Sequence, residues 1–430
     1  MPEYKVAIEQ LRIGVFVSLE RNWLKHPFLF SRFKITSDEQ IRTLREIGMK
    51  EVVCVPEKSD VLPLALKEAP PEPAASAPPA ESSETRVLWE LKKERIARLR
   101  ERRERDEQCE KQFVQSVTAV KGIMKNVEAG SKEAFEESDR LMRGIAQSLI
   151  PNRESAVQLM NTAFGKENVF FHSLNVAVLS MLLAREYGLD ADQMRIVGLG
   201  GLFHDIGKSR IPKNILNKET ALTRPEQKFV QLHPKYGVDI LSQIKMFPPD
   251  GLRAVYKHHE TMDGSGYPMA LKGKDISLAA KIVLIANVYD NHCNRLHAED
   301  SLTPHMALAH MFNMQKDLFD RGLLTLFIQC LGVYPPGTIV MLSDGSIGMV
   351  VSVNPRDPLH PSLLLYNPDV PKKDALIFDM MDDPGMRIES SVKASQLPSE
   401  VYGYLSPRTR ITYYVQESEY KPGRMPKATH

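Results

Sequence analysis

The chain has 430 residues, which is enough for two or three domains with a sizeable core. Its composition is that of a soluble protein, with 43% hydrophobic and 26% charged residues, and its net charge of +2 is too small to indicate nucleic-acid binding. The four cysteines form no CxxC pair, no signal peptide precedes them, and no apolar run reaches the roughly 20 residues of a membrane span, so we expect a cytoplasmic protein.

Residues 1–63 predict a small α+β module. "KVAIEQLRIGVFVSL" alternates as a strand does, "SDEQIRTLREIG" is typical of a helix capped by Ser37 and ended by Gly48, and "KEVVCV" returns as a strand. The module lacks clustered histidines, so we expect it to serve regulation, through signalling partners, or dimerisation.

Residues 64–85 are rich in Pro, Ala and Ser, which predicts an extended linker. Residues 86–144 are dense in both charge signs and begin "RVLWELKKERIARLRERRER", which predicts a charged helical connector. This helix either pairs with a second copy in a homodimer or stays a solvated single helix held by i,i+4 ion pairs.

Residues 145–332 predict a helical bundle, because "SLNVAVLSMLLAREYGL" and "ISLAAKIVLIANVYD" are strongly apolar at helical spacing. Residues 333–430 predict a β-rich extension with a hairpin at Asp344-Gly345. The expected fold is therefore multidomain, with an all-α bundle between a small α+β module and β-rich strands.

Five of the twelve histidines fall in this bundle, within "FFHSLNVAV", "FHDIGK", "QLHPKYG" and "KHHETMDGSGYP". They are His172, His204, His233, His258 and His259. A single buried histidine is usually a hydrogen-bonded core residue, but five are costly to bury unless a metal compensates them. On a continuous helix His204 and Lys208 share a face, and Asp205 lies about 100° away from His204. Asp205, with two oxygens, is the natural bridge between ions.

Imidazole and carboxylate ligands together suit iron, manganese, nickel or zinc better than calcium or magnesium. The supply exceeds what one four-coordinate ion needs, so we expect two. Two ions roughly 3.5–4 Å apart favour hydrolysis of a phosphate ester by an acidified bridging water that attacks as hydroxide. Lys208 would then neutralise phosphate oxygens or protonate the leaving alkoxide, unless it is only a lysine that reaches solvent from a helix end.

"HDIGK", "HPKYG" and "HHETMDGSGYP", in this order and spacing, resemble the HD-GYP family of bacterial cyclic di-GMP phosphodiesterases over about residues 145–330. The N-terminal segment resembles a module often found before this domain, and the C-terminal strands resemble a small β-rich extension. The resemblance implies an enzyme of second-messenger signalling that hydrolyses cyclic di-GMP either to pGpG or further to GMP. The resemblance also implies a set of metal ligands, which are His172, His204, Asp205, His233, His258 and His259. Asp205 would bridge the two ions, and Asp205 and Lys208 would be the catalytic residues.

The same resemblance implies that "DGSGYP" shapes the substrate pocket. The implied substrate-binding residues are Lys208, Asp263, Gly264, Gly266, Tyr267 and Arg295. A planar guanidinium suits Arg295 for binding phosphate.

The chain departs from the family pattern at two positions. Asn287 stands where the family has an aspartate ligand; its neutral amide oxygen can coordinate but should weaken one site, and Asp290 either substitutes or is structural. Members with three metals carry a glutamate where this chain has Asn168, next to Glu167. We therefore expect two divalent transition-metal ions, with iron or manganese favoured and nickel or zinc also suited.

Two other functions compete. One is a non-catalytic or weakly active sensor that binds cyclic di-GMP and signals through the connector or the module, which Asn287 motivates. The other is a phosphohydrolase of the wider HD group acting on another nucleotide, against which "DGSGYP" argues.

Overall fold

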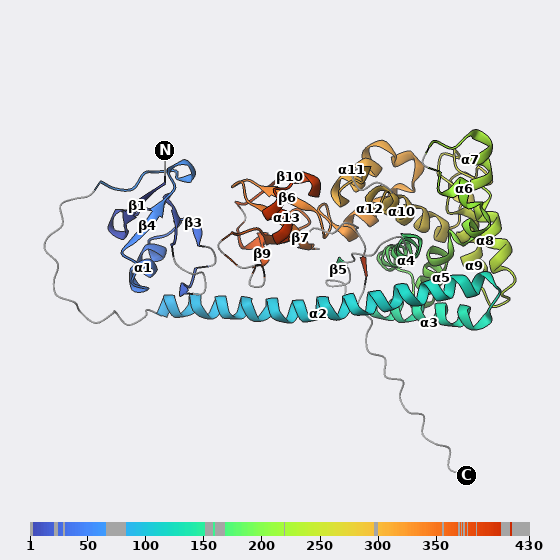
Figure 1. Cartoon of the computed structure of the whole chain (residues 1–430), viewed down its shortest axis with the longest axis horizontal. Helices are drawn as coiled ribbons and strands as arrows, with labels where there is room; N and C mark the ends of the chain where they lie inside the picture. The colour runs from blue at the N-terminus through green and yellow to red at the C-terminus, as the bar shows by residue number, and fades with distance from the viewer. Residues whose placement is uncertain are drawn as a thin grey trace, which may run out of the picture. The chain divides into compact units, whose positions relative to one another are not determined.

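The computed structural model describes residues 3–20, 25–28, 31–65, 83–150, 158–159, 168–218, 220–295, 300–354, 357–368, 370, 372, 375, 377–383, 385–405 and 413–414. The chain forms two compact units, Met1–Arg103 with Asn367–Leu376 and Glu104–Tyr366 with Ile377–His430. Figure 1 labels their helices and strands. The predicted fold class is confirmed, since a helical bundle is accompanied by a small α+β module and a C-terminal sheet. The domain boundaries themselves stay predictions.

The N-terminal module is an antiparallel sheet in the order β1-β4-β2-β3 with one helix. Its elements are β1 (Tyr4–Ala7), β2 (Phe16–Ser18), β3 (Arg32–Lys34), α1 (Asp38–Glu46) and β4 (Glu51–Cys54). Ser37 accepts a hydrogen bond from the backbone N–H of Gln40, as an N-cap does, and Gly48 leaves α1 at a φ of 73°. Val17, Ile35 and Leu44 are fully buried in its core.

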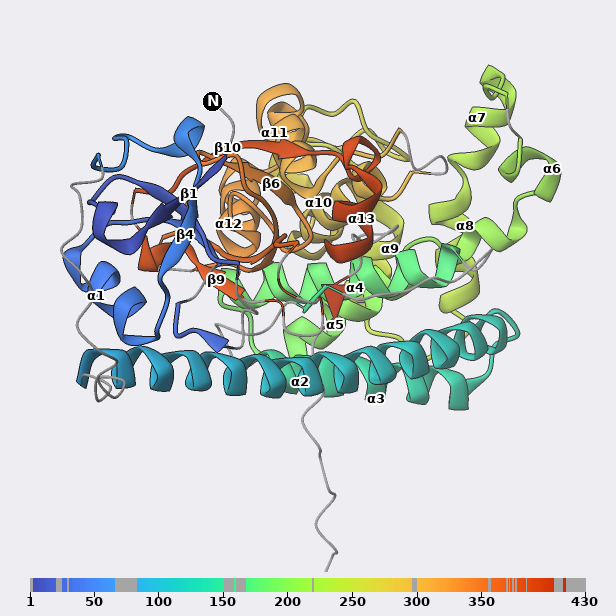
Figure 2. The same cartoon turned by 60° about the vertical axis from the view of Figure 1, so that its left-hand side comes forward.

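Two helices replace the single connector predicted over residues 86–144. Helix α2 (Ser83–Glu128) ends before Gly130, which has a φ of 81°, and Ser131 caps α3 (Lys132–Leu149). Figure 2 shows α3 beside the second half of α2. Met142 and Ile145 of α3 are fully buried in the core of the bundle, so the predicted boundary at residue 145 falls inside a helix that packs with the bundle.

The bundle is built around α4 (Asn168–Tyr187), whose residues 174–184 are almost wholly buried. Helices α5 (Ala191–Phe203), α10 (Leu278–Cys293) and α12 (Arg321–Leu331) contact it. The bundle also contains η4 (Ile206–Arg210), α6 (Lys213–Leu216), α7 (Arg224–Val230), α8 (His233–Leu241), α9 (Pro249–Lys257) and α11 (Pro304–Met314). Among the described residues, α4 is the one helix long and apolar enough to cross a membrane, and 72% of its apolar window is buried inside the protein. A helix that is apolar on all sides and covered by others is the core of a bundle.

The C-terminal sheet is antiparallel in the order β10-β6-β7-β8-β9. Its strands are β6 (Ile339–Leu342), β7 (Ile347–Ser352), β8 (Ser362–Leu365), β9 (Ile377–Asp379) and β10 (Ile388–Val392), and α13 (Ser399–Leu405) buries Val401 and Leu405 against it. The predicted β6–β7 hairpin turns at Gly345, with a φ of 81°. A separate ribbon pairs β5 (Gln158–Leu159) with β11 (Tyr413–Tyr414).

Candidate metal centre

Three histidines stand at helix ends, and the preceding turn fixes each ring. His204 follows α5, His258 follows α9 and His233 begins α8. Each Nδ1 lies 2.7–2.8 Å from the carbonyl oxygen three residues earlier in the chain. Because a carbonyl oxygen only accepts, Nδ1 donates, and Nε2 of the neutral ring is left with a lone pair for a ligand.

These lone pairs face one another. Nε2 of His233 and Nε2 of His258 are 3.2 Å apart, and so are Nε2 of His172 and Nε2 of His204. Two lone pairs directed at each other repel unless a cation lies between them. A separation of 3.2 Å is one that two nitrogens, each about 2.1 Å from the same ion, can adopt.

Asp205 lies between the two histidine pairs. Its Oδ1 is 3.2 Å from His233 Nε2, and its Oδ2 is 3.3 Å from His204 Nε2. The side chain is 4% exposed, and the buried Oδ1 has no hydrogen-bond partner in the structure. Such a carboxylate oxygen is expensive to bury without a cation. Two groups of ligand atoms, each within 4.8 Å, share this residue: Asp205, His233, His258 and His259; and His172, His204 and Asp205.

The electrostatics of the cluster suit a metal. Burial lowers the pKa of His204, and burial with neighbouring imidazoles lowers the pKa values of His258 and His259 well below the usual range. Burial opposes ionisation of Asp205, but His204 and Lys208 outweigh it and hold the pKa of this carboxyl well below its usual range. Neutral imidazoles and an ionised carboxylate are the forms that bind metal ions.

His172 of α4 is held by a carboxylate from α10. Its Nδ1 lies 2.5 Å from Oδ2 of Asp290, and the other oxygen of Asp290 accepts hydrogen bonds from the amides of Asn175 and Asn294. This arrangement makes Nδ1 the donor and leaves Nε2 for a metal. Asp290, which the sequence left either as a substitute ligand or as structural, therefore orients a predicted ligand, His172.

Asn287 lies on α10, one turn before Asn291, and is 2% exposed. Its Oδ1 accepts a hydrogen bond of 2.8 Å from the side-chain amide of Asn291. That bond uses one of the two lone pairs of the oxygen, so a second remains for a cation. The role of Asn287 as a ligand stays a prediction.

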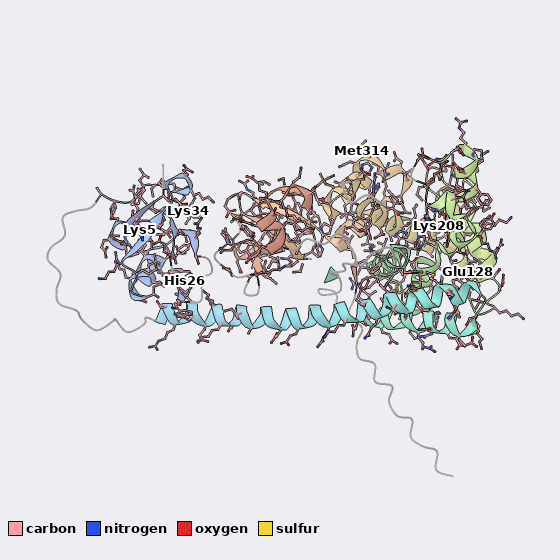
Figure 3. The ribbon with its side chains drawn as sticks, viewed as in Figure 1. Lys5, His26, Lys34, Glu128, Lys208 and Met314 are labelled. Atoms are coloured by element: carbon pink, nitrogen blue, oxygen red, sulfur yellow. The ribbon has the colours of Figure 1, made fainter. Side chains whose placement is uncertain are left out.

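Lys208 reaches the cluster by a different route from the one we expected. Helix α5 ends at Phe203 and the chain continues as η4. The prediction that His204 and Lys208 share a face of one continuous helix is therefore wrong. Lys208 instead lies 2.5 Å from Oδ2 of Asp205, three residues earlier, with 39% of its side chain exposed. The partly exposed ammonium therefore joins the shared carboxylate to solvent. Figure 3 labels Lys208 in the bundle.

Two glycines bring η4 and α8 together. A Cβ built on Gly207 would lie 2.0 Å from the carbonyl oxygen of His233 and 2.4 Å from the backbone nitrogen of Gly237. No side chain fits there, so the backbones touch. This contact brings Asp205 beside His233.

The loop after His259 forms a wall of the site. The Tyr267 ring stacks on the His259 ring, with centroids 4.5 Å apart, and its backbone N–H donates to the carbonyl of His259. Burial and the charge of Asp205 raise the pKa of Tyr267, so its hydroxyl stays protonated. Gly264 has a φ of 82°, and a Cβ on Gly266 would lie 2.3 Å from the His259 oxygen.

Two predicted substrate residues, Asp263 and Arg295, are exposed. Asp263 is exposed, and its Oδ1 accepts hydrogen bonds from Thr261 and Ser265 within its own loop. Arg295 is exposed at the end of α10, and its backbone N–H donates to Ser301. Among the described residues, neither side chain makes a hydrogen bond or ion pair with the predicted ligands, and their roles stay predictions. Glu167 and the side chain of Asn168 lie outside the described residues.

Sequence reasoning missed Glu260 and Asn175. Glu260 is fully buried although it follows two ligands in a polar loop, and Asn175 is a buried amide in the apolar α4. The sequence signal that could have identified them is a charged side chain next to predicted ligands, for Glu260, and an amide among apolar residues, for Asn175. His292, two residues after Asp290 in the sequence, has its Nε2 2.9 Å from Oε1 of Gln315.

Taken together, the helical bundle and its histidine–aspartate cluster define a metal-dependent protein of the HD class. A family model described as an HD domain matches residues 146–323, and one described as a domain of unknown function (DUF3391) matches residues 3–138. The chain is 30% identical over 368 residues to the cyclic di-GMP phosphodiesterase PA4108 of Pseudomonas aeruginosa, with 84% of each chain covered. It belongs to the HD-GYP family.

Two further relatives match over shorter stretches. The cyclic di-GMP phosphodiesterase response regulator RpfG of Xanthomonas campestris is 36% identical over 140 residues, which cover 32% of this chain and 37% of the relative. The 3'3'-cGAMP-specific phosphodiesterase 2 of Vibrio cholerae is 34% identical over 150 residues, 35% of this chain and 28% of the relative.

Proposed function

We propose that this protein is a metal-dependent phosphodiesterase that hydrolyses cyclic di-GMP to pGpG, or further to GMP, in bacterial second-messenger signalling. The observation that carries the proposal is Asp205, a buried carboxylate shared by two groups of ligand atoms. The name of the Pseudomonas relative, which matches along most of both chains, supports the substrate.

The donor set supports two divalent transition-metal ions, with iron or manganese favoured and nickel or zinc also suited. The groups are unequal. One has four candidate ligands and the other has three, with Asp205 counted in both, and Asn287 would add only a neutral oxygen to the second. We therefore expect one ion to bind more weakly than the other. When bound, the ions acidify water and hold phosphoryl oxygens.

The chain's own residues would complete the chemistry. Asp205 holds Lys208, whose ammonium can neutralise the non-bridging phosphate oxygens or give a proton to the leaving alkoxide. Tyr267, with its protonated hydroxyl, would shape the pocket for a base or sugar. Arg295 would bind a distal phosphate, and Asp263 would act through the loop conformation that it holds.

A turnover assay tests the proposal. Protein prepared without oxygen and loaded in turn with iron, manganese and nickel is incubated with cyclic di-GMP, and products are separated by chromatography. Asp205→Ala should lower turnover by at least about a thousandfold, because both groups lose a ligand and Lys208 loses its partner. Absence of turnover with all three metals, in protein that contains them, rejects the function.

The same experiment distinguishes the alternatives. Tight binding of cyclic di-GMP without hydrolysis by fully metallated protein selects the sensor, which the neutral Asn287 favours. Because the Vibrio relative is named for 3'3'-cGAMP, that dinucleotide belongs in the substrate panel. Faster turnover of 3'3'-cGAMP, or of a mononucleotide, than of cyclic di-GMP would identify that nucleotide as the substrate instead.

We place this activity in the cytoplasm, where free cysteines such as the buried Cys54 and Cys293 stay reduced. Homodimerisation through α2 and regulation through a signalling partner stay predictions. Sedimentation of the full chain tests the dimer.

A further inference from the structure

Glu260 is a buried carboxylate that the proposed chemistry does not use. It directly follows His258 and His259, and it is 0% exposed. Within the described residues the structure gives it no ion-pair partner. A buried carboxylate without a cation needs several hydrogen bonds to offset its lost hydration.

Both of its oxygens are occupied by the far end of the same loop. Oε1 accepts the backbone N–H of Met269 at 2.6 Å, and Oε2 accepts the backbone N–H of Leu271 at 2.7 Å. Bonds to an ionised acceptor at these lengths are strong. Ala270, between the two donors, is exposed, and among the described residues its N–H has no hydrogen-bond acceptor.

The segment closed by these bonds carries Tyr267. Gly266 packs against the backbone of residues 259–261, where a Cβ would lie 2.7 Å from the Cα of Glu260. Tyr267 then donates its N–H to His259 and stacks on its ring. Because Met269 is only two residues beyond Tyr267, fixing its N–H also fixes the tyrosine.

We propose that Glu260 is the positioning residue of the active-site wall: it acts through the Met269 and Leu271 amides to hold Tyr267 against the ligand His259, so that the site accepts a large cyclic dinucleotide. The inference rests on the proposed function for its substrate and on the hydrogen bonds for its geometry. Glu260 is not a catalytic residue, since it touches only the loop.

The test replaces one oxygen acceptor by a donor of equal size. Glu260→Gln turns an NH₂ group toward one backbone N–H, so one bond is lost. We expect unchanged metal content and a KM for cyclic di-GMP raised by about tenfold or more, while kcat/KM for the small diester bis(p-nitrophenyl) phosphate changes by less than about twofold. The matched control is Asp275→Asn, whose exposed side chain has no partner among the described residues.

Hydrogen exchange supplies a measurement independent of turnover. In the metal-loaded wild-type protein the Met269 and Leu271 amides should be protected and Ala270 should not, and Glu260→Gln should lose at least one protection. Equal exchange at all three positions in the wild type overturns the inference even if the variant does not fold. So does a folded variant with unchanged KM and protection. If the wild type does not hydrolyse cyclic di-GMP, the proposed function fails. The hydrogen-exchange rates of the Met269 and Leu271 amides then still test whether Glu260 holds the loop.

Discussion

At the scale of single residues, the site depends on hydrogen bonds that assign a proton to one nitrogen of each ring. Backbone carbonyls bind Nδ1 of His204, His233 and His258, and Asp290 binds Nδ1 of His172. The Nε2 atoms are therefore directed toward Asp205 before any ion binds. Preorganisation of this kind lowers the cost of metal binding, because the rings need not reorient.

Asn287 is the residue through which this chain should differ from other members of its family. Asn287→Asp places a carboxylate where the neutral amide stands, so we expect the weaker ion to bind about tenfold more tightly or better. The measurement is metal stoichiometry and affinity by titration with a competing chelator. Asn313→Asp is the matched control, because it places the same charge on an exposed residue of another helix, α11, that is not a partner of Asn287. Equal gains in both variants, or no gain in either, would contradict a ligand role for position 287.

At the scale of elements, the contact between η4 and α8 holds the two halves of the cluster together. Gly207→Ala forces a methyl group into the space taken by the His233 carbonyl and the Gly237 nitrogen. Backbone atoms cannot rotate away, so we expect a loss of about 3 kcal/mol in unfolding free energy and weaker metal binding as Asp205 moves from His233. Urea unfolding and metal titration measure the two effects.

The control for this substitution is Gly122→Ala. Gly122 lies in α2 with nothing within 4 Å of a built Cβ, and its backbone is helical. Alanine should therefore stabilise the helix by about 0.5–1 kcal/mol. A Gly207→Ala protein as stable as this control would show that the close contact is absent in solution.

The elements were predictable wherever apolar spacing decides the structure. The buried α4 and α10, the capped α1 and the β6–β7 hairpin follow from periodicity and turn residues. The end of α5 did not, because "GGLFHDIGK" keeps an apolar pattern while its backbone tightens into η4. That change is set by the contact of Gly207 with α8, which no local pattern encodes.

The site was predictable in its ligand types and not in the contacts that support them. His172, His204, Asp205, His233 and the His258–His259 pair meet, as their clustering indicated. The role of Glu260 depends on amides nine and eleven residues away along a folded loop. Asp290 and Asn175 are 115 residues apart in sequence, so their contact is a product of tertiary packing alone.

At the scale of the whole molecule, α2 is the element that runs from the first compact unit into the second. Its beginning is attached to the N-terminal module inside the first unit. Lys92, 2% exposed, donates to the carbonyl oxygens of His26 and Phe28 at 2.7 and 3.1 Å, and Thr85 donates to Glu46. Figure 3 labels His26 beside the start of this helix. The module is thus joined to the helix by buried polar contacts, whose strength should depend on the charge of Lys92.

Lys92 predicts a pH dependence for this attachment. Burial lowers its pKa to about 7, whereas the ordinary lysine value of 10.5 applies in the unfolded chain. Between these pH values the unfolded chain binds a proton that the folded unit has released, so the unfolding free energy rises with pH by at most about 1.4 kcal/mol per unit. Below pH 7 both states are charged and this contribution is absent; above 10.5 both are neutral and the gain is complete.

Lys92→Met should remove the rise, whereas Lys93→Met, whose exposed side chain pairs with Glu90, should keep it. Both tryptophans, Trp23 and Trp89, lie in the first unit, so urea unfolding followed by their fluorescence from pH 6 to about 10 measures it. Parallel pH profiles for the wild type and Lys92→Met would show that the attachment does not depend on this lysine's charge.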